Sequence, residues 1–267
     1  MSSDRRVVCC DLDGVVWRGD QPIPGAGGAI SDLRKAGFRV VFVSNNSSQP
    51  LREVAAKLDA AGAPTTTEDV VTSAVSAATL LASTLHRGAP VLACAGPGVL
   101  EALEAAGLRP VTRPPASAVV VGFHRGFDFD ELDRASAAVR DGARFVATNL
   151  DATYPVPGGM IPGSGAIAAA VATASGRAPE VAGKPERPMV DLIRKRFGSA
   201  GVVVGDRVST DGALAAALDW PFALVLSGVT QRDARPGGEA IPQPRPPFVA
   251  DDLASLVPKL VEVTSAG

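Results

Sequence analysis

Aspartates that directly follow apolar runs are the clearest candidates for chemistry in this sequence. The stretch VVCCDLDG places Asp11 and Asp13 after such a run, and GVVVGDRVSTDG places Asp206 after another, with Asp211 five residues later. Each aspartate also has an ordinary explanation as a turn residue or a helix-start residue. If folding brings them together, however, their charges repel one another strongly without a cation. An oxygen-rich site of this kind suits Mg²⁺.

Two further stretches supply residue types that bind phosphate. FVSNNSSQP ends an apolar run in Ser44 and Asn45 just before an expected helix, and VAGKP holds Lys184 between glycine and proline. Hydroxyls, amides and backbone N–H groups at a helix start suit phosphate. Serine and asparagine are also the usual helix N-caps, and a lysine in a loop usually faces solvent. At these positions the residues alone leave both interpretations open.

The elements that must position these residues follow the rhythm of an α/β fold. Short apolar runs alternate with amphipathic segments, which predicts a doubly wound, mostly parallel sheet flanked by helices. The expected strands are Val7–Cys10, Arg39–Val43, Val91–Cys94, Ala118–Val121, Arg144–Ala147, Gly201–Val204 and Phe222–Val225. The expected helices are Gly27–Ala36, Pro50–Ala61, Ser73–Leu85, Gly98–Ala106, Asp130–Asp141, Ser164–Ser175, Pro188–Arg196, Thr210–Ala217 and Leu253–Val261. Ligands of such sheets bind outside the carboxyl ends of the strands, where the candidate residues lie.

The distribution of polar signals predicts two domains. Residues 1–86 and 179–267 carry the candidate residues and are expected to form a Rossmann-like catalytic core, whereas residues 87–178 are expected to form an inserted, smaller α/β cap domain. Residues 227–247 are rich in proline and glycine, which predicts a long surface loop. The stretch CAGPGVLEALEAAG resembles a dinucleotide-binding fingerprint, but Glu101 occupies the place of its third glycine. A helix entry in the cap is the preferred interpretation there.

Composition excludes several classes of protein. The 267 residues are 46% hydrophobic, enough for a substantial core, and the formal net charge of −2 disfavours a nucleic-acid partner. We find no basic leader and no apolar run of roughly 18 residues, so we expect a cytoplasmic protein without a membrane partner.

Cysteine and histidine usage limits the kinds of bond and metal site. Cys9 and Cys10 are neighbours whose side chains point to opposite faces of a strand, so a disulfide framework is not expected. No cysteine and histidine set has zinc-ligand spacing, and His86 and His124 are interpreted as surface or packing residues. Any metal should therefore be held by carboxylates.

Four motifs in order resemble a known family. DLDGVVWRGDQPIPGA, FVSNNSS, VAGKP and GDRVSTD are similar to the four motifs of the haloacid dehalogenase (HAD)-like phosphatases. The closer resemblance is to the NagD and 4-nitrophenylphosphatase-like branch, which has a type IIA α/β cap, and ATNLDATYPVPGGMIPGSG also resembles that branch. The resemblance covers nearly the whole chain.

The resemblance implies a role for each motif residue. Asp11 would be the nucleophile that takes the phosphoryl group, and Asp13 the acid and base that protonates the leaving oxygen and then activates water. Ser44, with Asn45 alongside, would hold the phosphoryl group, and Lys184 would neutralise charge between nucleophile and phosphate.

The resemblance also implies the metal and its ligands. Mg²⁺ would be bound by a side-chain oxygen of Asp11, the backbone carbonyl of Asp13 and the side chain of Asp206, with Asp211 as an outer support. The implied activity is Mg²⁺-dependent hydrolysis of a small phosphomonoester through an aspartyl phosphate.

The substrate, the oligomeric state and two other classes of function stay open. Phosphoglycolate, glycerol phosphate, pyridoxal phosphate, sugar phosphates and nucleoside monophosphates are all candidates, with specificity expected from cap loops near 149–151 and 158–165. Related enzymes often dimerise through the cap, so a homodimer is an open expectation. The alternatives are a phospho-receiver-like signalling protein, against which the chain length argues, and a non-catalytic binding protein, against which the retained charged residues argue.

Overall fold

The computed structural model describes residues 6–156, 159–232 and 238–265, which form two compact units. The first unit comprises Met1–Ser44, Val54–Val71 and Ile193–Gly267, and the second comprises Asn45–Glu53 and Thr72–Leu192. Each is described here by itself. The division into a core of 1–86 and 179–267 and a cap of 87–178 stays a prediction, while packing groups residues 72–86 and 179–192 with the second unit.

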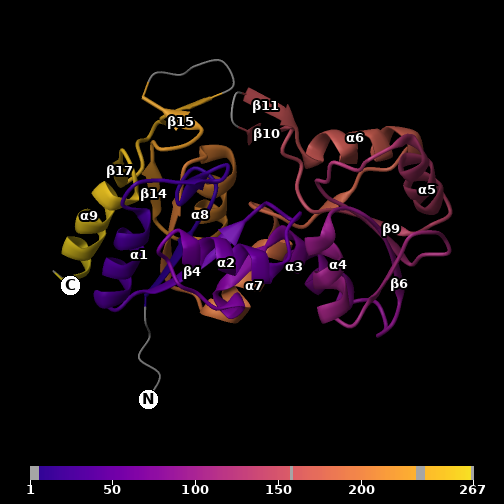
Figure 1. The fold of residues 1–267 in the computed structure, drawn as a ribbon, viewed down its shortest axis with the longest axis horizontal. Coiled ribbons are helices and arrows are strands. Elements are labelled where there is room, and N and C mark those ends of the chain that lie inside the picture. The colour runs from indigo at the N-terminus through magenta and orange to yellow at the C-terminus, as the bar shows by residue number, and fades with distance from the viewer. Residues whose placement is uncertain (1–5, 157–158, 233–237, 266–267) are drawn as a thin grey trace. The chain divides into compact units, whose positions relative to one another are not determined.

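A parallel sheet forms the centre of the first unit (Figure 1). Its strand order is β17 (Phe248–Ala250), β14 (Phe222–Val225), β13 (Gly201–Gly205), β1 (Val7–Cys10), β4 (Arg39–Ser44) and β5 (Val70–Thr72). The central strand β1 is at most 2% exposed and pairs in parallel with β13 on one side and β4 on the other. An apolar run with no polar alternation is what a strand covered on both faces requires.

The helices of this unit follow from short amphipathic segments. Helix α1 (Ala26–Lys35) packs beside α9 (Leu253–Ser265), as Figure 1 shows, and α8 (Ala213–Leu218) follows β13. Helices α2 (Leu51–Ala60) and α7 (Arg187–Phe197) each begin in the second unit and end in the first.

The second unit has its own five-stranded parallel sheet. The order is β12 (Glu180–Val181), β9 (Arg144–Ala147), β8 (Ala118–Val121), β6 (Pro90–Cys94) and β7 (Arg109–Val111). Because side chains alternate along β8, Val120 packs on one face of the sheet while Val119 and Val121 pack on the other.

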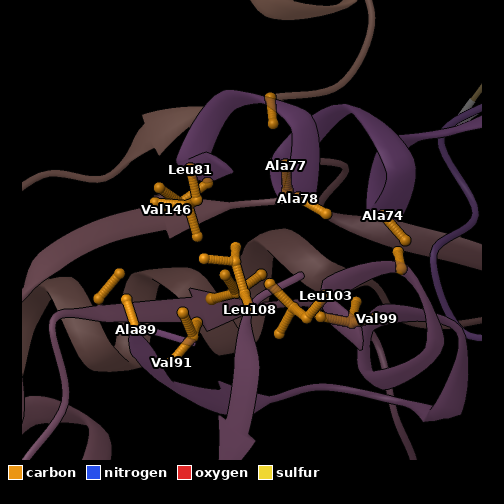
Figure 2. Close-up of a cluster of buried hydrophobic side chains, with 14 residues drawn as sticks. Ala74, Ala77, Ala78, Leu81, Ala89, Val91, Val99, Leu103, Leu108 and Val146 are labelled. Atoms are coloured by element: carbon orange, nitrogen blue, oxygen red, sulfur yellow. The ribbon is translucent and has the colours of Figure 1, made fainter. Parts of the chain in front are cut away.

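Each face of this second sheet carries a separate apolar cluster. Figure 2 shows the cluster beneath α3 (Ser73–Ala82) and α4 (Pro97–Ala105), where alanines of α3 meet Leu103, Leu108 and Val91. The opposite cluster lies beneath α5 (Phe129–Arg140) and α6 (Ser164–Ser175). Small alanine side chains let these helices approach the sheet closely, so the unit is a three-layer α/β structure.

The close approach of helix α4 to the backbone of residues 48–49 explains a glycine in the stretch that resembles a dinucleotide-binding fingerprint. Helix α4 begins at Pro97, and the Gly98 N–H donates a 3.1 Å hydrogen bond to the Ser48 carbonyl. A Cβ on Gly98 would overlap the carbonyl oxygen of Gln49. The glycine therefore has a packing role at this helix entry.

The predicted fold class is confirmed. The expected strands and helices occur within a few residues of their predicted bounds, and all three cysteines are buried free thiols. Among the strands of these two sheets, β5, β7, β12 and β17 were not predicted, because two or three residues at a sheet edge show too little periodicity. None of the helices in the described part of the chain is long and apolar enough to cross a membrane.

Candidate active site

Three buried carboxylates meet at one edge of the first unit's sheet. Asp11 directly follows β1 and Asp206 directly follows the neighbouring strand β13, and the Asp11 N–H donates a 2.9 Å hydrogen bond to the Val204 carbonyl. One ligand atom each from Asp11, Asp206 and Asp211 lies within 4.8 Å of the other two. All three residues are at most 8% exposed. The structure thus brings together three of the four aspartates that the sequence singled out.

Mutual repulsion makes this cluster of carboxylates suited to a bound cation. Two unit charges 4.8 Å apart repel one another by about 3.5 kcal/mol at an effective dielectric constant of about 20. A divalent cation bound between the carboxylates removes that cost, and an all-oxygen donor set is what Mg²⁺ prefers. The residues present therefore fit the predicted ion.

The loop after β14 holds Asp206 in place. The Val229 N–H donates to Asp206 Oδ2 at 2.5 Å, and the Thr230 N–H donates to the Asp206 carbonyl at 3.0 Å. A Cβ on either Gly14 or Gly228 would overlap the Asp206 carboxylate. Both glycines are therefore needed so that the backbone can surround this side chain.

Asp211 lies on a single π-helical turn, η2 (Val208–Gly212), that Glu239 braces. The Arg207 N–H donates to Asp211 Oδ2 at 3.2 Å. The Glu239 carboxylate accepts hydrogen bonds from the Val208 N–H at 2.7 Å, the Ser209 N–H at 3.1 Å and the Ser209 hydroxyl. Because the Asp211 carboxylate already accepts from the backbone of its own turn, the predicted supporting role suits it.

Glu239 is a site residue that sequence reasoning missed. It lies in the segment 227–247, which was predicted only as a surface loop, and it forms part of the short strand β16 (Glu239–Ala240). Its three contacts are to residues about thirty positions earlier in the chain. Local composition around Glu239 contained no signal of that contact, so only the fold reveals it.

Asp13 is oriented by an aromatic neighbour that was also missed. Its Oδ1 accepts a 3.1 Å hydrogen bond from the Trp17 indole N–H. The Lys57 ammonium lies 4.4 Å from the centre of the Trp17 ring, a cation–π contact that helps to fix the indole. Asp13 is half-buried, as a residue that must reach a substrate should be.

Ser44 occupies the predicted position at the end of the neighbouring strand. It is the last residue of β4, which pairs with β1, and it is 2% exposed. The carboxyl ends of β13, β1 and β4 therefore deliver Asp206, Asp11 and Ser44 to the same edge of the sheet.

In the second unit, Asn45 binds the backbone of Lys184. Asn45 Oδ1 accepts a 2.7 Å hydrogen bond from the Lys184 N–H, and Nδ2 donates to the Lys184 carbonyl at 3.2 Å. Lys184 is only 5% exposed, so it is not the solvent-facing loop lysine that the residue type alone favours. The Asn45 carbonyl in turn accepts from the Ser73 hydroxyl at 2.6 Å and from the Asn149 amide at 2.7 Å.

The predicted specificity loop 149–151 belongs to this same network. Asn149 is 5% exposed, and its Oδ1 accepts a hydrogen bond from the Asp151 N–H. Asp151 Oδ2 also accepts a 3.4 Å hydrogen bond from Asn45 Nδ2. These contacts give 149–151 a supporting role around Asn45. In the other predicted loop, Gly158 lies outside the described residues.

Two protein families match the parts of the chain that carry the predicted motif residues. A family described as haloacid dehalogenase-like hydrolase matches residues 8–109, and a second described as HAD-hydrolase-like matches residues 181–256. The first range contains Asp11, Asp13, Ser44 and Asn45, and the second contains Lys184, Asp206 and Asp211. The chain belongs to the haloacid dehalogenase-like hydrolase family.

Individual relatives place the chain among the phosphatases of that family. It is 43% identical over 251 residues to the D-glycerol 3-phosphate phosphatase of Mycobacterium tuberculosis, a match that covers 92% of this chain and 69% of the relative. The crystal structure of the glycerol phosphate phosphatase from that organism in complex with magnesium matches with a TM-score of 0.84 and 41% identity, covering 95% of this chain and 77% of that one. A p-nitrophenyl phosphatase from Archaeoglobus fulgidus matches with a TM-score of 0.86 and 30% identity, covering 98% and 100%. The chain is accordingly a phosphatase of the HAD-like type, as its motifs predicted.

Proposed function

We propose that this protein is a Mg²⁺-dependent phosphatase that hydrolyses a small phosphomonoester through an aspartyl phosphate on Asp11. The observation that carries the proposal is the set of buried Asp11, Asp206 and Asp211 oxygens within 4.8 Å of one another at the strand ends. A carboxylate set of this kind needs a divalent cation, and a relative at 41% identity has been crystallised with magnesium.

The first step is displacement at phosphorus. A carboxylate oxygen of Asp11 forms a bond to phosphorus while the bond from phosphorus to the substrate's ester oxygen breaks. Asp13, held by Trp17, donates a proton to that leaving oxygen, which departs as an alcohol. The Ser44 hydroxyl at the end of β4 donates to a phosphoryl oxygen.

The second step regenerates the enzyme. Asp13, now ionised, takes a proton from water, whose oxygen forms a bond to phosphorus as the bond to Asp11 breaks. Inorganic phosphate leaves and Asp13 is again protonated. Two displacements let water attack a phosphoenzyme instead of the original ester.

The metal and a lysine reduce the charge repulsion in both steps. The side chains of Asp11 and Asp206 and the carbonyl of Asp13 would hold Mg²⁺, with Asp211 in support. Bound Mg²⁺ supplies positive charge that lets a carboxylate approach a phosphate dianion. Lys184 is proposed as the second positive charge; its support is its backbone bonding to Asn45, the residue that follows Ser44 in the chain.

Glycerol 3-phosphate is the first substrate to test. The relative with 43% identity is named as a D-glycerol 3-phosphate phosphatase. We therefore place a three-carbon phosphomonoester ahead of phosphoglycolate, pyridoxal phosphate, sugar phosphates and nucleoside monophosphates.

The proposal also covers the cellular location, the oligomeric state and the partners of the protein. Three buried free thiols are consistent with a reducing, cytoplasmic location. A homodimer formed through the second unit is also proposed; among the described residues, the exposed large hydrophobics Leu100, Phe129, Leu150 and Met160 lie in that unit. Neither a nucleic acid nor a membrane is proposed as a partner.

Phosphate release from a panel of these esters, with and without Mg²⁺, tests the function. We expect chelator-sensitive release that Asp11→Asn abolishes and that Asp32→Asn preserves, because Asp32 is an exposed aspartate paired with Lys35. Metal-independent release, or full activity of Asp11→Asn, would overturn the proposal. A phosphoenzyme that persists instead of turning over would favour the signalling alternative.

A further inference from the structure

The second unit contains a second group of side chains that can bind a metal ion. It differs from the aspartate cluster in its position in the sequence and in its residue types. Cys94 ends β6, His124 follows β8, and Glu131 lies on α5. One ligand atom of each lies within 4.8 Å of the other two. The sequence had indicated no cysteine and histidine set with zinc spacing and had placed His124 among surface or packing residues. The structure shows His124 packed beside Cys94 and Glu131. Because three separate elements supply these side chains, sequence spacing contains no sign of the group.

We propose that Cys94, His124 and Glu131 bind a divalent transition-metal ion of the zinc class. Sulfur, imidazole nitrogen and carboxylate oxygen are the three ligand types that Zn²⁺ accepts. Mg²⁺ prefers oxygen ligands alone, so the two groups of residues select different ions. Three protein ligands leave a fourth tetrahedral position for water or a small ligand.

The geometry of His124 supports this assignment. Its Nε2 lies 3.1 Å from Glu131 Oε2. Two ligand atoms, each about 2.0–2.1 Å from a tetrahedral ion, are separated by about 3.3 Å, so this pair already has nearly the required spacing. The edge contact between the His124 and Phe127 rings, with centroids 6.1 Å apart, helps to fix the imidazole.

A buried nitrogen atom points into the group. Among the described residues, His124 Nε2 is fully buried and makes no hydrogen bond of acceptable geometry, despite its proximity to Glu131. An unsatisfied buried polar atom costs free energy, and a metal ion is one partner that removes this cost.

The chemistry of Cys94 sets how binding occurs. Burial, together with the Glu131 charge, raises the pKa of the Cys94 thiol, so without an ion the sulfur is protonated at neutral pH. Burial also raises the pKa of Glu131. A divalent ion favours the thiolate, so binding forms a metal–sulfur bond and releases the thiol proton to solvent.

A cobalt titration of the full-length protein tests the proposal. The protein is stripped of metal with a chelator, the chelator is removed, and excess Mg²⁺ is added to fill the aspartate site. Co²⁺ is then titrated and thiolate-to-cobalt charge-transfer absorption is recorded. We expect this absorption to saturate at one ion per chain and to disappear when Zn²⁺ displaces cobalt.

Matched variants identify the ligands. Cys94→Ala should abolish the absorption, whereas Cys10→Ala should retain it, because Cys10 is also a buried cysteine that ends a strand but lies in the first unit. His124→Gln and Glu131→Gln should weaken cobalt binding by at least about tenfold. Circular dichroism checks folding, and the partly exposed Glu131 provides a mild variant if Cys94→Ala does not fold. Absence of the absorption in the wild type, or its persistence in Cys94→Ala, would overturn the proposal.

Discussion

The side chain of Asn45 binds both polar backbone groups of Lys184, accepting from its N–H at 2.7 Å and donating to its carbonyl at 3.2 Å. A lysine that must supply charge at a fixed point needs a fixed backbone, and a primary amide is the side chain that can donate and accept at once. The predicted contact of Asn45 with phosphate stays a prediction. Its amide oxygen and nitrogen are both engaged in this pairing.

Replacement of Asn45 by alanine should therefore weaken both stability and catalysis. Loss of the two hydrogen bonds to Lys184 and of the longer one to Asp151 is expected to lower the free energy of unfolding by about 1–3 kcal/mol, measured by urea denaturation. Asn45→Asp keeps the acceptor and loses the donor, so it should fall between wild type and Asn45→Ala. Equal activity in all three proteins would contradict a positioning role for Asn45.

Gly228→Ala should disable the metal site, because the added Cβ would overlap the Asp206 carboxylate. A displacement of about 1 Å at a catalytic site costs on the order of 100-fold in rate, so we expect a loss of that size in activity measured across a magnesium titration.

Gly28→Ala is the matched control for that substitution. Gly28 is an exposed residue of α1, and a Cβ there would meet no atom within 4 Å. This variant should keep full activity and gain about 0.5–1 kcal/mol of stability, since alanine is the better helix former. If Gly228→Ala retains the wild-type response to magnesium, the proposed placement of Asp206 is wrong.

Glu239→Ala should raise the magnesium concentration needed for half-maximal activity. Its carboxylate accepts three hydrogen bonds from the turn that carries Asp211, and loss of supporting contacts around metal sites typically weakens affinity 10–100-fold. Activity assays over a range of Mg²⁺ measure the change. Glu262→Ala, on an exposed position of α9, provides the control, and identical magnesium curves for the two variants would refute the bracing role.

The raised pKa of Glu131 predicts that the stability of the metal-free protein depends on pH. Burial raises the pKa of Glu131 above the usual 4.5, and the Asp128 charge raises it further. The charges of His124 and Arg134 and a hydrogen bond with Cys94 act in the opposite direction. The folded state then holds the proton more tightly than the unfolded state, so this carboxyl's contribution to stability falls as pH rises through about 4.5 toward the folded-state pKa.

Denaturation of wild type and Glu131→Gln in the presence of chelator measures this effect. The stability of wild type relative to the variant should decrease as pH rises above about 4.5. Exposed Glu104→Gln serves as the comparison for removal of a surface carboxylate. A relative stability that increases with pH would show that the shift has the opposite sign.

The sequence predicted those parts of the fold and site that depend on local pattern. Uninterrupted apolar runs identified β1 and β13, and the aspartates that follow them lie together as expected. Neighbouring parallel strands bring their carboxyl ends to one edge, so the two motifs that follow β1 and β13 were enough to predict the acidic cluster.

Contacts between distant segments could not be predicted in the same way. Glu239 lies in a segment that resembles an ordinary surface loop, yet it contacts a turn about thirty residues earlier in the chain. Cys94, His124 and Glu131 come from three elements whose pairing depends on the order of strands in the second sheet. Such contacts depend on tertiary packing, which periodicity does not encode.

The first unit is discontinuous, and this has a consequence for biosynthesis. Asp11 is translated before the Thr72–Leu192 segment, whereas Asp206 and the Val229 and Thr230 amides that hold it are translated after that segment. A nascent chain therefore carries Asp11, the proposed nucleophile, throughout the synthesis of that segment without the residues that complete the proposed metal site. The second unit, whose sheet ends at Val181, has all of its strands available before that completion.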